Sequence, residues 1–278
     1  MITHSLRTLA ARIALGVVSV SVISSAWAAQ SPPADGSVYQ QYAPIDLTGN
    51  WVSLVTEDWQ LRMITPPKGD LSNLPLNAEG ERVTNSWDPV RDEAAGMACQ
   101  AYAAPSIMRE PGRLRITWVG GGNSLRVETD AGQQTRLFQF GEATPSTTDR
   151  SWQGFSRAEW QYAGRFSLDT VGAEIGPAGQ RSRNTRPSPI RPNGGALKVV
   201  TTQLRAGYLR KNGVPFSENA VVTEYFNVYT DVDMTQWLVV TTIVHDPRYL
   251  RTDYITSSNF RKEPDGSKWK PRPCVVRD

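Results

Sequence analysis

Charged side chains inside apolar stretches are the residues of this 278-residue chain best placed to do chemistry. Glu224 lies in the run AVVTEYFNVY, on the same strand parity as Val222 and Phe226. Arg136 lies in TRLFQF, on the parity of two phenylalanines. A carboxylate on an apolar face is costly unless it is paired. Two interpretations follow: Glu224 and Arg136 are each other's buried partners, or they form the polar floor of a ligand cavity in which Glu224 acts as acid or base.

His245 and Tyr208 are the other candidates for acid–base chemistry. His245 is the only histidine left once the N-terminal segment is removed, and beside Asp246 at a strand end it suits either a general base or a strand cap. A zinc enzyme usually needs two or three His or Cys ligands. The sequence holds no nucleophile elbow, P-loop or dinucleotide fingerprint. We therefore predict no metal and no cofactor, with catalytic roles for Glu224, His245 and Tyr208 only if the protein is an enzyme.

Aromatic and charged residues in predicted loops and strands form the candidate binding set. One cluster lies around residues 59–70 and another around 208–211. Arginine and aromatic side chains in loops at the mouth of a barrel suit an aromatic or carboxylated ligand. The predicted ligand-binding residues are Trp59, Arg62, Lys68, Glu128, Arg136, Trp152 and Arg210.

Apolar and alternating runs predict the strands that must position these residues. Three runs rich in Val, Thr, Ile, Tyr and Trp, at 197–204, 220–229 and 236–246, predict an antiparallel meander. Alternating runs between residues 113 and 140 predict hairpins before it. Roughly nine strands with turns about every ten residues indicate a sandwich or a barrel. We predict an all-β fold, a single antiparallel, lipocalin-like β-barrel of roughly eight to ten strands, because successive hairpins close most simply that way.

Little helix is expected, and it lies on the N-terminal side. Asn77 suits the cap of a short helix that ends near Trp87, with two glutamates in its first turn. Residues 91–102 suit a second short helix. The barrel domain is predicted to span residues 46–278, with a long insertion at 171–195 that holds four Pro and four Arg. That insertion is either a solvated flexible segment or a lid or arm for an acidic partner.

The first 28 residues have the features of a secretory signal peptide. Arg7 and Arg12 precede an apolar run, and Ala-Trp-Ala at 26–28 is a cleavage site. The apolar run is shorter than the ~20 residues that a spanning helix needs. We therefore expect residues 1–28 to be removed, the protein to reach the periplasm or beyond, and no membrane insertion to follow. Residues 29–45, polar and rich in Pro, Gly, Ser and Gln, are predicted to be a flexible leader.

Charge and cysteine content narrow the class of protein further. Without the two arginines of the signal peptide, 28 basic side chains remain against 27 acidic ones. This near-neutral balance argues against a nucleic-acid binder, which would carry a basic stripe. Cys99 and Cys274 are the two cysteines, and in an oxidising compartment we predict that they form a disulfide, two buried thiols being the alternative.

Several motifs in a fixed order support a family resemblance. They are a Cys followed by APSIM and a Pro (99–111), an R-x-x-T-D-x-G hairpin (126–136), SWQGFS with EW (151–160), LKVVTT (197–202), TEY (223–225) and TTIVHDP (241–247). This order resembles a widespread group of exported bacterial proteins, from Asp46 to the C-terminus with gaps. The resemblance carries no general activity. The likeness of the barrel to lipocalin-like domains implies a small apolar ligand by analogy of fold.

Three functions from different classes remain after the sequence analysis. The favoured one is an exported β-barrel that binds a small apolar or aromatic molecule. The second is a cofactor-free lyase, isomerase or hydrolase that acts on a small hydrophobic or aromatic substrate with acid–base residues in the barrel cavity. The third is an interaction protein of the cell envelope with a filled core. The sequence predicts no oligomeric state.

Overall fold

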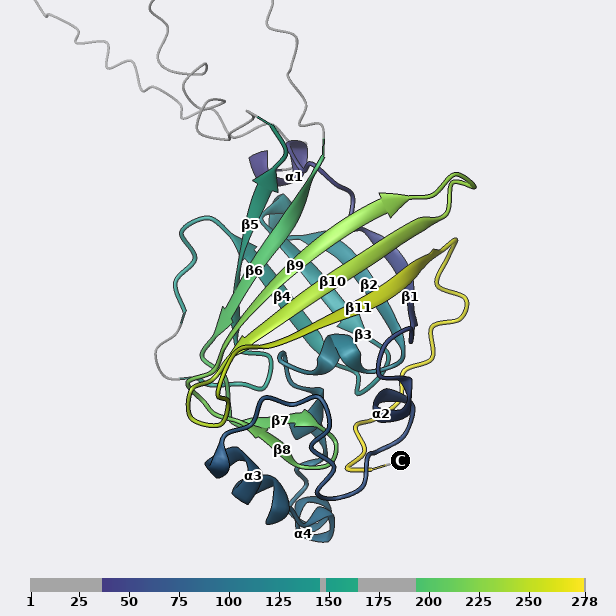
Figure 1. Cartoon of the computed structure of the whole chain (residues 1–278). Coiled ribbons are helices and arrows are strands. Elements are labelled where there is room, and N and C mark those ends of the chain that lie inside the picture. Colours follow the sequence, from purple (N-terminus) through teal and green to yellow (C-terminus); the bar gives the residue numbers. More distant parts are fainter. Residues whose placement is uncertain (1–36, 146–148, 165–193, 278) are drawn as a thin grey trace, which may run out of the picture. The chain divides into compact units, whose positions relative to one another are not determined.

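A closed barrel of nine strands forms the centre of the protein (Figure 1). The computed structural model describes residues 37–145, 149–164 and 194–277, so the predicted signal peptide and nearly all of the predicted insertion lie outside the described residues. Around the barrel the strand order is β1-β11-β10-β9-β6-β5-β4-β3-β2. The barrel strands are β1 (Gly49–Leu54), β2 (Arg113–Val119), β3 (Ser124–Thr129), β4 (Thr135–Phe140), β5 (Phe155–Tyr162), β6 (Gly195–Thr202), β9 (Val221–Thr230), β10 (Gln236–His245) and β11 (Tyr254–Glu263).

The prediction of a β-barrel is confirmed, with one correction to strand direction. The predicted meander is β6, β9 and β10, which neighbour one another in antiparallel register. One neighbouring pair, β4 and β5, runs parallel. A closed ring with an odd number of strands cannot alternate direction throughout, so at least one pair must be parallel. The sequence predicted roughly eight to ten strands, and an even number would have allowed every neighbouring pair to be antiparallel. The observed number of nine requires a parallel pair.

A small α/β layer covers one end of the barrel. The hairpin of β7 (Gly207–Arg210) and β8 (Val214–Phe216) lies there with α3 (Ala78–Asn85) and α4 (Pro89–Ala94) (Figure 1). The predicted cap of α3 is present, because Asn77 accepts a hydrogen bond from the Gly80 amide at 3.0 Å. Gly213, in the β7–β8 turn, has φ +81°, and a Cβ there would overlap Trp87. The turn can therefore approach the helices so closely only with glycine.

More helix forms than the sequence predicted, although it lies largely on the N-terminal side. The predicted second helix is split between α4 and a 3₁₀ turn. The additional elements are α1 (Val38–Gln41), α2 (Trp59–Met63) and the 3₁₀ turns η1 (Ala98–Tyr102), η2 (Ile107–Arg109) and η3 (Gly120–Gly122). None of the described helices is long and apolar enough to cross a bilayer.

The described part of the predicted leader packs against the barrel. Tyr39, in α1, stacks on Phe140 with ring centres 5.2 Å apart, and its carbonyl accepts a hydrogen bond from Trp160 Nε1 at 2.8 Å. Ala43 and Ile45 also pack against the barrel core. The contacts of the domain therefore begin before residue 46, because Tyr39 and Ile45 supply apolar surface that the polar composition of the segment conceals.

Many buried side chains point into the barrel interior. Trp51 is fully buried, and its indole Nε1 donates to the Leu47 carbonyl at 2.9 Å. Strand alternation directs every second residue inward. The buried apolar side chains of the barrel strands include Trp51, Leu114, Ile116, Leu125, Val127, Phe138, Phe140, Trp160, Leu197, Val199, Phe226, Leu238, Val240 and Phe260.

A disulfide ties the C-terminal tail to the same end of the molecule as the α/β layer. Cys99 in η1 and Cys274 in the tail are bonded at 2.04 Å, as the sequence predicted, across 175 positions of sequence. The tail that follows β11 is thereby held beside η1. The tail contributes Arg272, Pro273 and Val275 to the wall of a pocket outside the barrel.

Candidate functional site

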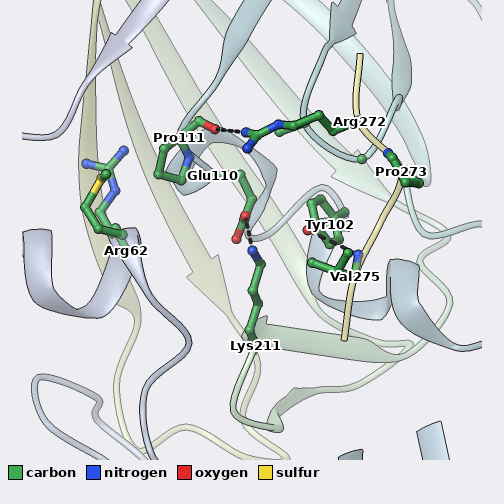
Figure 2. Close-up of a pocket in the computed structure, with 11 residues that line it drawn as sticks. Arg62, Tyr102, Glu110, Pro111, Lys211, Arg272, Pro273 and Val275 are labelled. Atoms are coloured by element: carbon green, nitrogen blue, oxygen red, sulfur yellow. Dashed lines mark hydrogen bonds and ion pairs between the residues drawn. The ribbon is translucent and has the colours of Figure 1, made fainter. Parts of the chain in front are cut away.

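A pocket of about 460 Å³ lies outside the barrel, between α2, the turn after β7 and the C-terminal tail (Figure 2). In Figure 2, Arg62 lies on one side, Tyr102 and Val275 lie on the other, and Glu110 and Lys211 lie between them. The lining mixes apolar surface with three cationic side chains. The residues that line it are Arg62, Met63, Tyr102, Glu110, Pro111, Ala131, Gly132, Lys211, Arg272, Pro273 and Val275.

Tyr102 and Lys211 form the centre of this pocket. Lys211 Nζ lies 3.1 Å from a Glu110 carboxylate oxygen and 5.1 Å from the centre of the Tyr102 ring. The hydroxyl of Tyr102 accepts a hydrogen bond from the Val275 amide at 3.3 Å, and burial raises the pKa of this phenol. Gly132 has φ +71°, and a Cβ there would overlap the Tyr102 ring. The ring can pack this close to the β3–β4 turn only because residue 132 is glycine.

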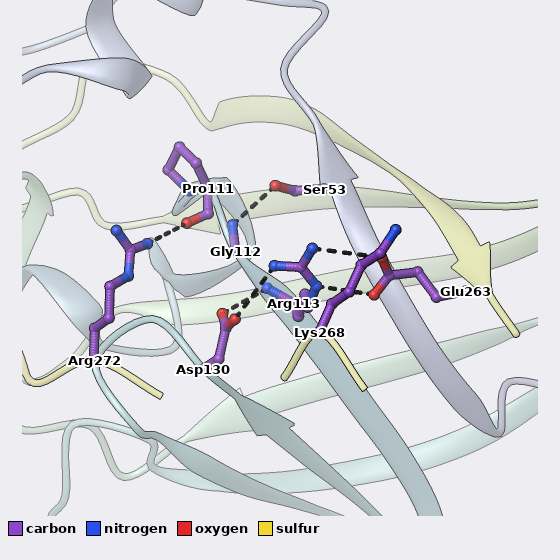
Figure 3. Close-up of polar contacts among 8 residues, drawn as sticks. All are labelled: Ser53, Pro111, Gly112, Arg113, Asp130, Glu263, Lys268 and Arg272. Atoms are coloured by element: carbon purple, nitrogen blue, oxygen red, sulfur yellow. Dashed lines mark hydrogen bonds and ion pairs between the residues drawn. The ribbon is translucent and has the colours of Figure 1, made fainter. Parts of the chain in front are cut away.

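A network of charges fixes the tail against the barrel rim (Figure 3). Arg113 lies at its centre, with Nε 2.9 Å from a Glu263 oxygen and its amide 2.6 Å from an Asp130 carboxylate oxygen. The backbone amide of Arg272 donates to the Asp130 carbonyl at 2.7 Å, and its guanidinium donates to the Pro111 carbonyl at 3.2 Å. These contacts position Arg272 at the edge of the pocket.

Three buried arginines lie next to the pocket. Arg62 of α2, Arg109 of η2 and Arg210 of β7 are 7 %, 6 % and 5 % exposed. They line a second cavity, of about 20 Å³, together with Ser106, Glu110 and Lys211. The two cavities share Arg62, Glu110 and Lys211, so they are neighbours. Two predicted clusters, around residues 59–70 and 208–211, therefore meet here.

The predicted Arg136–Glu224 pair forms inside the barrel. Arg136 Nη1 and Nη2 lie 2.9 and 2.5 Å from the two carboxylate oxygens of Glu224, and both side chains are fully buried. Arg136 Nη2 also lies 3.1 Å from the Thr201 hydroxyl, which lies 2.8 Å from the Ser156 hydroxyl. This bidentate pair, with a further hydroxyl contact, is the arrangement that offsets the desolvation of two buried charges.

The three predicted acid–base residues do not meet. Glu224 faces the barrel interior. His245 points outward and is 61 % exposed, and its Nδ1 lies 2.7 Å from an Asp253 oxygen, so its carboxylate partner is Asp253 and not Asp246. Tyr208 lies outside the barrel on β7 and donates to an Asp92 oxygen at 2.8 Å. Burial, with the hydrogen bond to Asp92, raises the pKa of Tyr208.

The other predicted ligand-binding residues lie apart from the pocket. Trp59 is 60 % exposed and Lys68 is also exposed. Glu128 lies across from Arg115 in the barrel register, on the face opposite the buried Val127. Trp152 packs under the guanidinium of Arg205 at 4.8 Å. None of these residues lines either of the two cavities described above.

The predicted list of ligand-binding residues omitted four residues of the site, Tyr102, Arg109, Lys211 and Arg272, although Lys211 belongs to the predicted cluster around 208–211. Tyr102 is the last residue of the predicted second helix, and Arg109 lies between that helix and the first hairpin, in a segment without a clear period. A charged Arg109 directly after the apolar stretch APSIM was the available signal of a buried cation. Arg272 lies in the tail, where only the predicted disulfide indicated that the chain returns to the fold.

The described residues contain no group of three or more His, Cys, Asp or Glu side chains arranged to hold a metal ion. The fold and pocket define a closed β-barrel with an accessory layer and a cationic pocket outside the barrel. No protein-family model matches the chain, and no curated protein matches it either. The family resemblance therefore rests on the sequence motifs alone.

Proposed function

We propose that this protein is an exported binder of a small molecule with an apolar or aromatic body, and that the ligand occupies the pocket beside the C-terminal tail. The pocket carries this proposal. Its volume of about 460 Å³ lies in the range of small-molecule sites, which run from about 300 to 1,000 Å³. Its lining combines Tyr102, Met63, Val275 and two prolines with a few charged groups, the combination that holds and orients a small ligand.

The barrel interior is a weaker place for a ligand. Many large apolar side chains point into it, and its buried charges, Arg136 and Glu224, already pair with each other. The location outside the barrel therefore differs from the lipocalin analogy. The enzyme alternative receives no support from the geometry, because Glu224, His245 and Tyr208 lie in three separate places.

Export to the periplasm or beyond belongs to the same proposal. It is supported by the signal-peptide features of residues 1–28 and by the disulfide, which suits an oxidising compartment. We propose small molecules as its partners, and neither nucleic acid nor membrane.

A pair of matched substitutions tests where the ligand binds. A thermal-shift screen against aromatic monomers, fatty acids and terpenoids first supplies a ligand. Val275→Trp then fills the pocket from a residue that is 37 % exposed, while Val232→Trp makes the same change in the fully exposed β9–β10 turn. We expect ligand protection to survive in Val232→Trp and to disappear in Val275→Trp. Equal protection in both variants would place the ligand elsewhere and overturn the proposal.

A further inference from the structure

We propose that Arg62, Arg109 and Arg210 form a binding site for the anionic oxygens of an acid group: a carboxylate, phosphate or sulfate. The acid group belongs either to the ligand of the neighbouring pocket or to a small free oxyanion. The evidence for this site is the set of buried arginines, and the proposal holds whether or not the pocket binds an organic ligand.

Each of the three arginines has one protein partner and spare donors. Arg62 Nε donates to the Arg109 carbonyl at 2.8 Å, and Arg62 Nη1 and Nη2 have no partner. Arg109 Nη2 lies 3.0 Å from an Asp58 oxygen, and Arg109 Nη1 has no partner. Arg210 Nη1 donates to the Ser72 carbonyl at 2.7 Å, and its Nε and Nη2 have no partner. Five buried guanidinium nitrogens are thus left as donors around one cavity.

Such a set of donors is unfavourable in a protein that has only to fold. A buried donor without a partner costs roughly 1–3 kcal/mol, and more when it is charged. The cavity lining carries four cationic side chains and one carboxylate, Glu110, which already pairs with Lys211. Asp58 pairs with Arg109 but is not among the residues that line the cavity. An oxyanion would accept several of the spare donors at once, which is the geometry that guanidinium groups favour.

The electrostatics of Arg62 agree with this geometry. Burial, followed by the positive charge of Arg109, lowers the pKa of Arg62 to about 10, although Glu57, Glu110 and Asp58 act in the opposite direction. The nearby carboxylates therefore do not compensate the buried charge in full. An anion bound between the arginines would compensate the remaining positive charge.

The size of the cavity limits what enters it. About 20 Å³ is room for roughly one atom of the size of a water oxygen. One oxygen of an acid group fits there, and the rest of that group extends toward the pocket through the shared residues Arg62, Glu110 and Lys211. A ligand with an aromatic body in the pocket and a carboxylate toward the arginines satisfies both cavities.

The test measures thermal stability in the presence of named probes at constant ionic strength, held with sodium chloride. The probes are sodium acetate, phosphate, sulfate and 4-bromobenzoate, with 4-bromobenzyl alcohol as the neutral match of the last. The proteins are the mature wild type, Arg62→Gln and the control Arg82→Gln, which removes an arginine 67 % exposed and paired with Glu79. Arg210→Lys, which keeps the charge and loses the fork of donors, serves if Arg62→Gln fails to fold.

We expect at least one oxyanion to raise the melting temperature of the wild type and of Arg82→Gln in a saturable way. In Arg62→Gln or Arg210→Lys the apparent Kd should rise by about tenfold or more, the value of one charged hydrogen bond. Protection by acetate, phosphate or sulfate identifies a free oxyanion as sufficient, whereas protection by 4-bromobenzoate alone identifies the acid end of a pocket ligand. In the second case the anomalous signal of bromine in a crystal should lie in the pocket.

Three results would overturn the proposed anion site. The first is that no oxyanion protects beyond chloride. The second is equal protection in wild type and variants, which would mean a non-specific salt effect. The third is that 4-bromobenzyl alcohol protects as well as 4-bromobenzoate, in which case the proposed function survives and the anion site fails. Protection by acetate, phosphate or sulfate with no response to 4-bromobenzoate or 4-bromobenzyl alcohol would instead support the anion site and count against the proposed function.

Discussion

In the described part of the chain, arginine side chains are buried in two regions that differ in their hydrogen-bond partners. Inside the barrel, Arg136 meets Glu224 through two hydrogen bonds and Thr201 through a third, and only its Nε lacks a partner. Beside the pocket, Arg62 and its two arginine neighbours keep five unpartnered nitrogens. Both regions are nearly free of solvent contact, so burial by itself does not distinguish them.

The two regions differ in whether the protein itself supplies hydrogen-bond and charge partners for the buried arginines. The barrel pair is complete within the chain, and removing either partner would strand a charge. In the second region, five guanidinium nitrogens have no hydrogen-bond acceptor within the described part of the chain. A satisfied buried charge therefore indicates a structural role, and an unsatisfied one indicates a place for a ligand. The predictions below test that distinction, beginning with the largest expected effect.

Glu224→Gln should be the most destabilising change. It leaves the positive charge of Arg136 buried without a counter-charge, and we expect a loss of about 3–5 kcal/mol in the free energy of unfolding. Denaturant melts measure it, with the exposed Glu159→Gln of β5 as a control expected to stay within about 0.5 kcal/mol. The double variant Arg136→Met/Glu224→Leu should recover most of the loss. A loss for Glu224→Gln below about 1.5 kcal/mol would contradict the structural role of the pair.

Removing the disulfide should have the next largest effect. Cys99→Ser/Cys274→Ser frees the tail, and we expect a loss of about 2–4 kcal/mol, below the chain-entropy ceiling of about 5 for so long a loop. Binding in the pocket should weaken as well, because Pro273 and Val275 belong to its wall. Denaturant melts and a binding assay measure the two effects. Two reactive thiols in unfolded, unreduced wild-type protein would show that the bond is absent.

Arg62→Gln should behave unlike Glu224→Gln when no oxyanion is present. It removes one hydrogen bond to the Arg109 carbonyl but also removes a desolvated charge and its repulsion from Arg109. We expect these effects to offset each other to within about 1 kcal/mol. Melts of both variants in the same chloride buffer make the comparison. A loss as large as that of Glu224→Gln would show that the two regions are alike after all.

The stability gap between wild type and Arg62→Gln should depend on pH. Folding lowers the pKa of Arg62 from its ordinary value to about 10, so its charge costs the folded state stability at every pH below about 10. Above that pH the folded protein releases the proton before the unfolded chain does, and the cost shrinks. Between pH 8 and pH 10.5 or so the wild type should therefore gain on the variant. A stability gap that stays constant or moves the other way refutes the shift.

His245→Ala should change the least. His245 lies on the outer face in an exposed pair with Asp253, and such pairs contribute about 0–1 kcal/mol. We expect no measurable change in the ligand protection described above. Loss of protection in this variant, with stability intact, would restore His245 to the functional site and place that site on the barrel exterior.

Several features of this protein follow from the sequence alone, because they depend on local periodicity or on elimination. Alternation along 220–229 directs Glu224 and Phe226 to one face, whatever the partner strand. The length and composition of the runs indicate a barrel, and two cysteines allow one disulfide. Arg136 was recognisable as the partner of Glu224, because few cations share an apolar strand face.

Only the tertiary structure decided where the unsatisfied arginines lie. Arg62, Arg109 and Arg210 come from a helix, a 3₁₀ turn and a hairpin that are far apart in the sequence, and no period links them. Their convergence depends on how these elements pack against one end of the barrel, which is a long-range property of the chain. For the same reason the sequence favoured a ligand in the barrel cavity or at the barrel mouth, whereas the pocket lies outside the barrel, beside the C-terminal tail.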